Sequence, residues 1–214
     1  MGSFLHAKES LRLGILSSHE GSNLQTIIDA CKQGRLQAEC CVVVSNNSGA
    51  TALERARKES IPHFHLSSKT HKDPKILDRT IVEVLKNHQV NLVILSGYMK
   101  LLGPQTLSHY RGHILNIHPS RLPKFGGTGF YGLAVHKAVL AADERVTGVT
   151  IHQVDDQYDQ GQIIAQTEVP VHQGDTAESL RNRVLKCEHK FYVETLQRLA
   201  TREIALNFNE NVNR

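Results

Sequence analysis

Short runs of consecutive apolar residues alternate along the chain with segments whose apolar residues recur every three or four positions. The first pattern is typical of strands buried in a parallel sheet, and the second is typical of amphipathic helices that cover such a sheet. Three apolar runs predict the early strands, at Leu11–Ser17, Glu39–Ser45 and Asn91–Ser96. The clearest helix is predicted over Asp73–His88, where Asp73 can cap the N-terminus and Pro74 fits the first turn.

The second half of the chain continues this alternation. It predicts a strand at His113–His118, a loop rich in Pro and Gly, a helix at Leu133–Asp143, two strands at Val149–Val154 and Ile163–Val169, and a long closing helix from Asp175. Strands that alternate with helices indicate an α/β fold with a mostly parallel sheet flanked by helices. We expect one domain over residues 11–205, a flexible N-terminal segment at residues 1–10 and a frayed tail at residues 206–214.

Composition narrows the class of protein. The chain has 214 residues, of which 40% are hydrophobic and 21% are charged, as in an ordinary globular domain. Aromatic residues make up only 5% and Trp is absent, which argues against a base-stacking surface for nucleic acid. The first eleven residues hold no apolar segment of signal-peptide type, and no apolar run is long enough to cross a membrane. We therefore expect a cytoplasmic protein that binds neither nucleic acid nor membranes.

The four cysteines show no C-x-x-C spacing, and two of them are adjacent in an apolar run. This arrangement suggests reduced core thiols rather than a disulfide framework or a zinc site. The formal net charge is +4, and it is unevenly distributed: residues 51–150 carry 14 basic and 7 acidic side chains, whereas residues 151–214 carry 7 and 10. A basic middle would suit a small anionic ligand, although a solvated surface explains it equally well.

The first candidate site follows the first predicted strand, at Gly21, Ser22 and Asn23. Ser22 with Gln25 three residues later matches a capping box, which would place free backbone N–H groups at a helix N-terminus. Such an N-terminus binds anions, and phosphate is the natural guest. The alternative is a well-capped helix without a ligand.

The second candidate is Asn116 with His118. Strand alternation puts both side chains on one face, about 7 Å apart, at the carboxyl end of a predicted parallel strand. An amide beside an imidazole can stabilise a developing oxyanion and move a proton, but a hydrogen-bonded core pair would look the same. Asp159 follows the next strand; it is either a turn-forming residue or a carboxylate that orients His118 and raises the pKa of its imidazole.

Glu188 is the fourth candidate, because it lies on the apolar stripe of its own predicted helix. A charge in that position needs a partner, which either a ligand amine or an internal Arg could supply. Two further patterns favour no site. Gly127–Gly132 matches the dinucleotide fingerprint G-x-G-x-x-G, but residues 119–126 separate it from the preceding strand. The clustered histidines near His63 and His113 lack a third ligand at a spacing known for zinc.

Taken together, these motifs resemble the phosphoribosylglycinamide formyltransferases, the folate-dependent enzymes of purine synthesis. The resemblance runs from about Leu13 to Leu196. It rests on five segments: Gly21–Leu24, Leu95–Met99, Leu115–Lys124, Asp159–Gly161, and Glu188–His189 with Tyr192. It implies a single Rossmann-like formyltransferase domain with a late antiparallel strand pair and a long C-terminal helix.

The family also implies an activity: transfer of a formyl group from 10-formyltetrahydrofolate to the amine of glycinamide ribonucleotide, without a metal. Carried onto matching positions, the catalytic residues are Asn116, His118 and Asp159. The implied ribonucleotide contacts are Gly21, Ser22, Asn23, Gly97 and Glu188. The implied folate contacts are Met99, Lys100, Leu101, Leu102, Asn116, Asp155, Asp156 and Asp159. The expected partners are these small-molecule substrates, and the expected state is a monomer or homodimer.

Some positions depart from the common family pattern, namely His19, Pro74, Lys100 and Val193. The Gly-rich segment Phe125–Gly132 is predicted to be a mobile or tightly turning active-site loop. Two alternatives stay open: another formyltransferase of the superfamily, acting on a sugar nucleotide or on methionyl-tRNA, and a dinucleotide-binding oxidoreductase that uses Gly127–Gly132.

Overall fold

The structure is a computed structural model that describes residues 10–206. Its strands are β1 (Leu11–Leu16), β2 (Ala38–Ser45), β3 (His63–His65), β4 (Leu92–Leu95), β5 (Ile114–His118), β6 (Val146–Gln153) and β7 (Ile163–Pro170). Its helices are α1 (Ser22–Lys32), α2 (Thr51–Lys58), α3 (Pro74–Asn87), α4 (Pro104–His109), α5 (Leu133–Ala141) and α6 (Ala177–Ala200). The predictions for the two chain ends lie outside the described residues, apart from residues 10 and 206.

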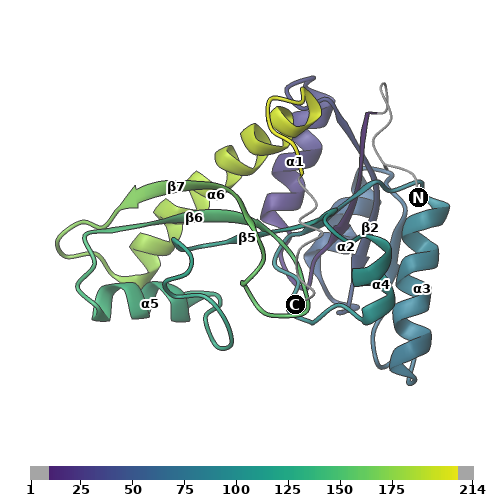
Figure 1. The fold of residues 1–214 in the computed structure, drawn as a ribbon, viewed down its shortest axis with the longest axis horizontal. Helices are drawn as coiled ribbons and strands as arrows, with labels where there is room; N and C mark the ends of the chain where they lie inside the picture. Colours follow the sequence, from purple (N-terminus) through teal and green to yellow (C-terminus); the bar gives the residue numbers. More distant parts are fainter. Residues whose placement is uncertain (1–9, 207–214) are drawn as a thin grey trace, which may run out of the picture.

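The strands form one seven-stranded sheet in the order β3-β2-β1-β4-β5-β6-β7. The first five are parallel, whereas β6 is antiparallel to β5, and β7 is antiparallel to β6 (Figure 1). This confirms the predicted α/β fold with a mostly parallel sheet, a late antiparallel pair and a long C-terminal helix. The apolar pattern gave no bounds for α2 and α4, because helices of 8 and 6 residues hold too few turns to show a period.

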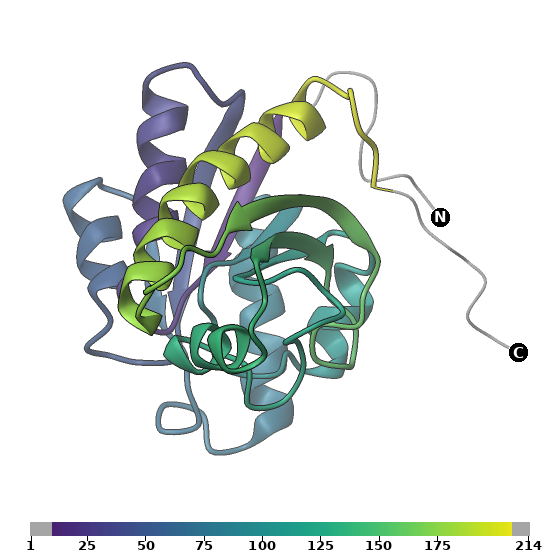
Figure 2. The ribbon, with the colours of Figure 1, turned by 90° about the vertical axis from the view of Figure 1, so that its left-hand side faces the viewer.

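Two hydrophobic clusters, one on each face of the sheet, hold the layers together. Alternate residues of β2 show the division: Val43 belongs to the cluster with α1, α2 and α6, whereas Val42 and Val44 belong to the cluster with α3 and α4. The long helix α6 lies beside α1 (Figure 2), and the buried Tyr192 hydroxyl on α6 donates to the carbonyl oxygens of Leu95 and Leu115 at 3.4 Å. The sheet is therefore covered on both faces, and its strand ends remain for a site.

The start of α3 agrees with the prediction, whereas the starts of α1 and α6 differ from it. Asp73 caps α3 by accepting a hydrogen bond from the backbone N–H of Lys75, and Pro74 is the first residue of the helix, as predicted. The predicted capping box at Ser22 is wrong: Gly21 is the N-cap of α1, in a left-handed conformation, and no side chain caps the helix. The closing helix begins at Ala177 instead of Asp175, because Thr176 and Ser179 form a reciprocal capping box.

In the range 10–206 no helix is long and apolar enough to span a membrane. Cys31, Cys40, Cys41 and Cys187 are free thiols, as predicted, although only Cys41 is fully buried.

Candidate active site

A cavity of about 590 Å³ lies at the carboxyl ends of β1, β4 and β5. Its walls come from the loop before α1, the turn after β4, the end of β5, the Gly-rich loop 127–132, the β6–β7 connection and one face of α6. This volume lies in the range of small-molecule sites, and the carboxyl ends of parallel strands are where open α/β sheets bind ligands. The cavity collects candidate residues that are far apart in the sequence.

The N-terminus of α1 forms one end of the cavity. Gly21 has a φ of +65°, and a Cβ added there would lie 2.9 Å from the Cβ of Ala52, so only glycine fits this turn. The backbone of the loop is held by α2, since Ala52 donates its N–H to His19 O and Arg55 donates its side-chain Nε to Glu20 O. The first N–H groups of α1 have no intrahelical acceptors, and Gly21, Ser22 and Asn23 line the cavity. A helix N-terminus in such a position is able to bind an anion.

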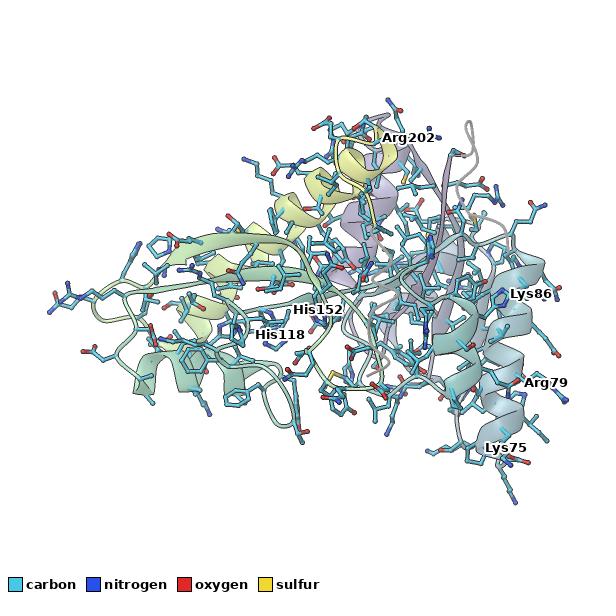
Figure 3. The ribbon with its side chains drawn as sticks, viewed as in Figure 1. Lys75, Arg79, Lys86, His118, His152 and Arg202 are labelled. Carbon is cyan, nitrogen blue, oxygen red and sulfur yellow. The ribbon has the colours of Figure 1, made fainter. Side chains whose placement is uncertain are left out.

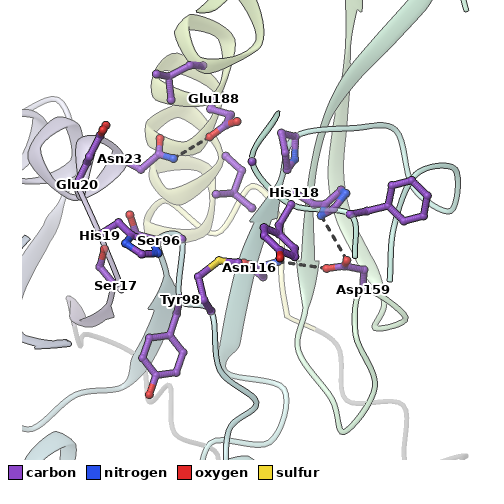
Figure 4. A pocket seen from close by; sticks show the side chains of 18 of the residues that line it. Ser17, His19, Glu20, Asn23, Ser96, Tyr98, Asn116, His118, Asp159 and Glu188 are labelled. Atoms are coloured by element: carbon purple, nitrogen blue, oxygen red, sulfur yellow. Dashed lines mark hydrogen bonds and ion pairs between the residues drawn. The ribbon is translucent and has the colours of Figure 1, made fainter. Parts of the chain in front are cut away.

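The polar cluster at the floor of the cavity comes from β5, β6 and the β6–β7 connection. Asn116 Nδ2 lies 3.4 Å from Asp159 Oδ1, and His118 Nδ1 lies 3.4 Å from Asp159 Oδ2 (Figure 4). The backbone N–H of Gly127 donates to Asp159 Oδ2 at 2.9 Å. The structure thus brings together the three predicted catalytic residues and ties one of them to the Gly-rich loop.

His152 completes this cluster, and sequence reasoning missed it. The register between β5 and β6 sets His152 opposite Asn116, and its Nε2 lies 3.1 Å from Asn116 Nδ2. Its Nδ1 lies 2.7 Å from the carbonyl oxygen of Gln153, which only accepts, so Nδ1 carries the hydrogen. In a neutral ring Nε2 then accepts from Asn116, and this contact orients the Asn116 amide. The same Nε2 lies 3.4 Å from Asp159 Oδ1, so His152 contacts both residues. Only the strand register reveals this contact.

Burial and charge set the protonation states of the cluster. Burial lowers the pKa of His118, and the negative charge of Asp159 and a 2.7 Å hydrogen bond to Phe125 O offset only part of this effect. Burial acts to raise the pKa of Asp159, but its contacts with His152, His118 and the N–H of Gly127 hold it below the ordinary value. At neutral pH the cluster therefore pairs a neutral His118 with an ionised Asp159.

Glu188 lies on the wall between these two regions. Its side chain is 9% exposed, and its Oε2 accepts a hydrogen bond from Asn23 Nδ2 at 2.8 Å (Figure 4). Burial raises the pKa of Glu188 to about 7, although the Asn23 hydrogen bond and the charge of Arg181 act in the opposite direction. The hydrogen-bond partner of this carboxyl is therefore the Asn23 amide, and Arg181 acts on it through its charge without a hydrogen bond.

The cavity lining includes most of the predicted site residues but not all of them. Gly97 and Met99 after β4 line it, together with Gly21, Ser22, Asn23 and Glu188 and the three predicted catalytic residues. Five predicted folate residues lie outside this lining: Lys100, Leu101, Leu102, Asp155 and Asp156. Leu102 packs into the core beside α3, and the other four are exposed. The Gly-rich loop 127–132 also lines the cavity, and residues 119–126 separate it from the end of β5 at His118, so it is not a direct strand-to-helix turn.

Two further cavity residues were not singled out from the sequence. His136 on α5 is buried and its Nδ1 has no hydrogen-bond partner; burial, with the nearby charges of Arg181 and His118, lowers its pKa to about 4. Arg181 lies on α6, two turns before Glu188. Across residues 10–206 the structure holds no group of three or more His, Cys, Asp or Glu residues arranged to bind a metal ion.

Comparison with known proteins gives a consistent result. A model of the formyl transferase family matches residues 11–196. The chain is 43% identical to the chloroplastic phosphoribosylglycinamide formyltransferase of Vigna unguiculata, over 90% of this chain and 62% of that protein. It is 35% identical to phosphoribosylglycinamide formyltransferase of Bacillus subtilis, over 88% of this chain and 94% of the other. The chain thus spans less than two thirds of the plant relative and nearly all of the bacterial one.

Solved structures show the same likeness. The crystal structure of glycinamide ribonucleotide transformylase 1 from Symbiobacterium toebii superposes with a TM-score of 0.85 at 37% identity, covering 92% of this chain and 91% of that one. These likenesses favour a formyltransferase and not a dinucleotide-binding oxidoreductase. The family model matches most of this chain, and the chain covers nearly all of a bacterial relative. The chain therefore belongs to the phosphoribosylglycinamide formyltransferase family.

Proposed function

We propose that this protein transfers a formyl group from 10-formyltetrahydrofolate to the amine of glycinamide ribonucleotide, a step of purine biosynthesis. The observation that carries the proposal is the cluster of Asn116, His118 and Asp159 in the same cavity as the N-terminus of α1. One end suits a phosphate and the other suits acyl transfer, so the cavity can hold the phosphate of the ribonucleotide and bring its amine to the formyl donor.

The ribonucleotide would lie along the cavity wall from α1 to β5. Its phosphate would accept hydrogen bonds from the free N–H groups at Gly21, Ser22 and Asn23. Glu188 would face the glycinamide side, where a carboxyl with a pKa near 7 can either accept a hydrogen bond or donate one. Gly97 also lines the cavity, after β4, and has a positive φ of 66°.

The donor supplies an activated formyl carbon when it is bound. Met99 and Tyr158 are 37% and 44% exposed and line the same cavity, so they offer apolar surface to a flat ring. The remaining predicted folate residues, Lys100, Leu101, Leu102, Asp155 and Asp156, stay predictions for the outer part of that molecule. We also expect a cytoplasmic enzyme that is a monomer or homodimer.

Attack of an amine on the formyl carbon places negative charge on the formyl oxygen, and Asn116 would stabilise it. The Asn116 amide uses one N–H toward His152 at 3.1 Å, whereas its other contact, to Asp159, is longer at 3.4 Å. A substrate oxygen can therefore displace the weaker contact and leave the amide oriented. A single donor of this kind is worth about 3 kcal/mol of transition-state stabilisation.

His118 and Asp159 would handle the proton that the attacking nitrogen loses. His118 Nε2 donates to Phe125 O, so Nδ1 is the free basic atom and it faces Asp159 Oδ2. A proton accepted at Nδ1 is stabilised by that carboxylate, because an adjacent negative charge favours the imidazolium. Asp159 can take the proton directly or through water. Collapse of the tetrahedral intermediate then breaks the bond between the formyl carbon and the folate nitrogen, and the proton passes to that leaving nitrogen.

The proposal is tested by mixing the purified protein with glycinamide ribonucleotide and a 10-formylfolate, and following release of the deformylated folate. We expect turnover that requires both substrates, and a formylated ribonucleotide by mass spectrometry. Parallel reactions with a sugar-nucleotide amine and with methionyl-tRNA separate the other acceptors of the superfamily. Absence of turnover with the ribonucleotide, or faster turnover with another acceptor, would refute the proposal.

A further inference from the structure

Most of the Asp, Glu, Lys and Arg side chains that line the cavity are acidic, which does not suit a phosphorylated substrate. Three carboxyl groups line it, those of Glu20, Asp159 and Glu188. Among the lining residues that the structure describes, Arg181 is the single Lys or Arg. Burial raises the pKa of Glu188 to about 7, so this carboxyl is partly protonated at neutral pH. A substrate that carries a phosphate dianion would still meet the carboxyl groups of Glu20 and Asp159 in a cavity in which Arg181 is the single Lys or Arg.

Two of the three imidazoles that line the cavity, those of His118 and His136, do not supply this missing charge; the third, His19, lies in the loop before α1. Burial lowers the pKa of His118 and lowers that of His136 to about 4, so both rings are uncharged at pH 7. The basic middle of the sequence does not supply it either. Figure 3 shows Lys75, Arg79 and Lys86 along α3, away from the region of His118 and His152.

The position of Arg181 on α6 directs it to the cavity. Arg181, Leu185 and Glu188 follow the i, i+4, i+7 spacing of one helical face, and all three line the cavity. The charge of Arg181 also lowers the pKa of Glu188 on α6 and of His136 on α5, both of which line the cavity.

Arg181 is also uncommitted, in contrast to its neighbour Arg183. Arg183 donates to both carboxylate oxygens of Asp175, at 2.6 and 2.9 Å, and to Pro170 O. The Arg181 side chain makes no hydrogen bond or ion pair with any residue in the described part of the chain. An exposed arginine without a partner at a cavity wall is available to an anionic ligand.

We infer that Arg181 is a specificity residue for the phosphorylated substrate: its guanidinium supplies the positive charge by which the cavity accepts the phosphate-bearing amine and discriminates against the same molecule without phosphate. This inference rests on the proposed function. In this inference the backbone N–H groups of α1 position the phosphate by hydrogen bonds, and Arg181 supplies the positive charge. Formyl-transfer chemistry does not involve Arg181, so its loss affects binding and not the catalytic step.

The test compares Arg181→Gln with the wild-type protein. We expect the KM for glycinamide ribonucleotide to rise roughly 10-fold, the effect of losing one charge-assisted interaction. We expect kcat and the KM for the folate to stay within about 2-fold of wild type, because the cluster around Asp159 is unchanged. Arg181→Lys should recover part of the KM, and the difference between wild type and Arg181→Gln should shrink as salt concentration rises.

Lys186→Gln is the matched control, since it removes the same charge from an exposed position of the same helix outside the cavity. It should leave every KM unchanged. The dephosphorylated substrate should show equal KM values with wild type and Arg181→Gln. An unchanged ribonucleotide KM in Arg181→Gln, an equal loss with the dephosphorylated substrate, or a rise confined to the folate KM would overturn the inference. If the wild-type protein transfers no formyl group, the proposed function fails instead.

Discussion

The buried carboxyl of Glu188 makes a sharp prediction about stability, because its pKa is raised to about 7 by burial. In the unfolded chain this carboxyl titrates at its ordinary value of about 4.5. Between the two values the folded protein keeps a proton that the unfolded chain has released. The corresponding stability is fully present below about pH 4.5 and is lost progressively as pH rises to about 7.

The magnitude follows from the interval between the two pKa values. Each pH unit of that interval is worth about 1.4 kcal/mol, so a rise from 4.5 to about 7 corresponds to about 3 kcal/mol of unfolding free energy. Glu188→Gln removes the titration and keeps an oxygen that can accept from Asn23. Relative to the wild type, the variant should therefore gain about 3 kcal/mol between pH 4.5 and pH 7.5.

Urea unfolding of both proteins without ligand, at four pH values from 4.5 to 7.5, measures this difference directly. Other titrating groups are common to both proteins and cancel in the difference. Glu194→Gln, at a position 55% exposed on the same helix, is the control and should show no pH-dependent difference. A wild-type-to-variant difference that stays constant across the range would refute the buried, protonated state of Glu188.

Three further substitutions test the catalytic cluster and the anion site. Asp159→Asn should lower kcat by roughly 10²- to 10³-fold and move the acid limb of the pH–rate profile to lower pH, because the carboxylate raises the pKa of His118. A pH–rate series measures both effects, and near-normal turnover would contradict a catalytic role for Asp159. His152→Phe should lower kcat about 10-fold with an unchanged ribonucleotide KM, since the Asn116 amide loses its acceptor; an altered KM with normal kcat would instead indicate a binding role. Gly21→Ala should raise the ribonucleotide KM about 10-fold. A Cβ there would meet an alanine of α2, and the left-handed backbone would add roughly 1–2 kcal/mol of strain. Steady-state kinetics measure this KM, which would stay unchanged if the loop binds no substrate.

The parts of the fold that the sequence predicts are those with a local signature. The strands β1, β2 and β4 are buried on both faces, so each appears as a continuous apolar run. The start of α3 is equally local, because Asp73 and Pro74 act within one turn. The N-terminus of α1 is not local: its conformation depends on the close approach of Ala52, which lies on a different helix.

The residues of the proposed catalytic cluster also differ in whether a local sequence pattern predicts them. Asn116 and His118 share a face of one strand, and a period of two residues is enough to pair them. The contact between His152 and Asn116 depends on the register between β5 and β6, and a slip of one residue would turn His152 to the other face of the sheet. No local pattern encodes that register, so His152 could not be identified as part of the site before the strands were aligned.

The charge of the cavity is not predictable from the sequence either, because the electric field in a cavity depends on the residues that form its walls. The basic residues between positions 51 and 150 include those of α3, which covers the sheet face opposite α1 and α6. The cavity is built from strand ends and from the cavity-facing side of α6, which belongs to the acidic C-terminal part of the chain. A segment with an excess of acidic residues therefore supplies the cation of the cavity, Arg181, and a sum of charge along the sequence cannot locate it.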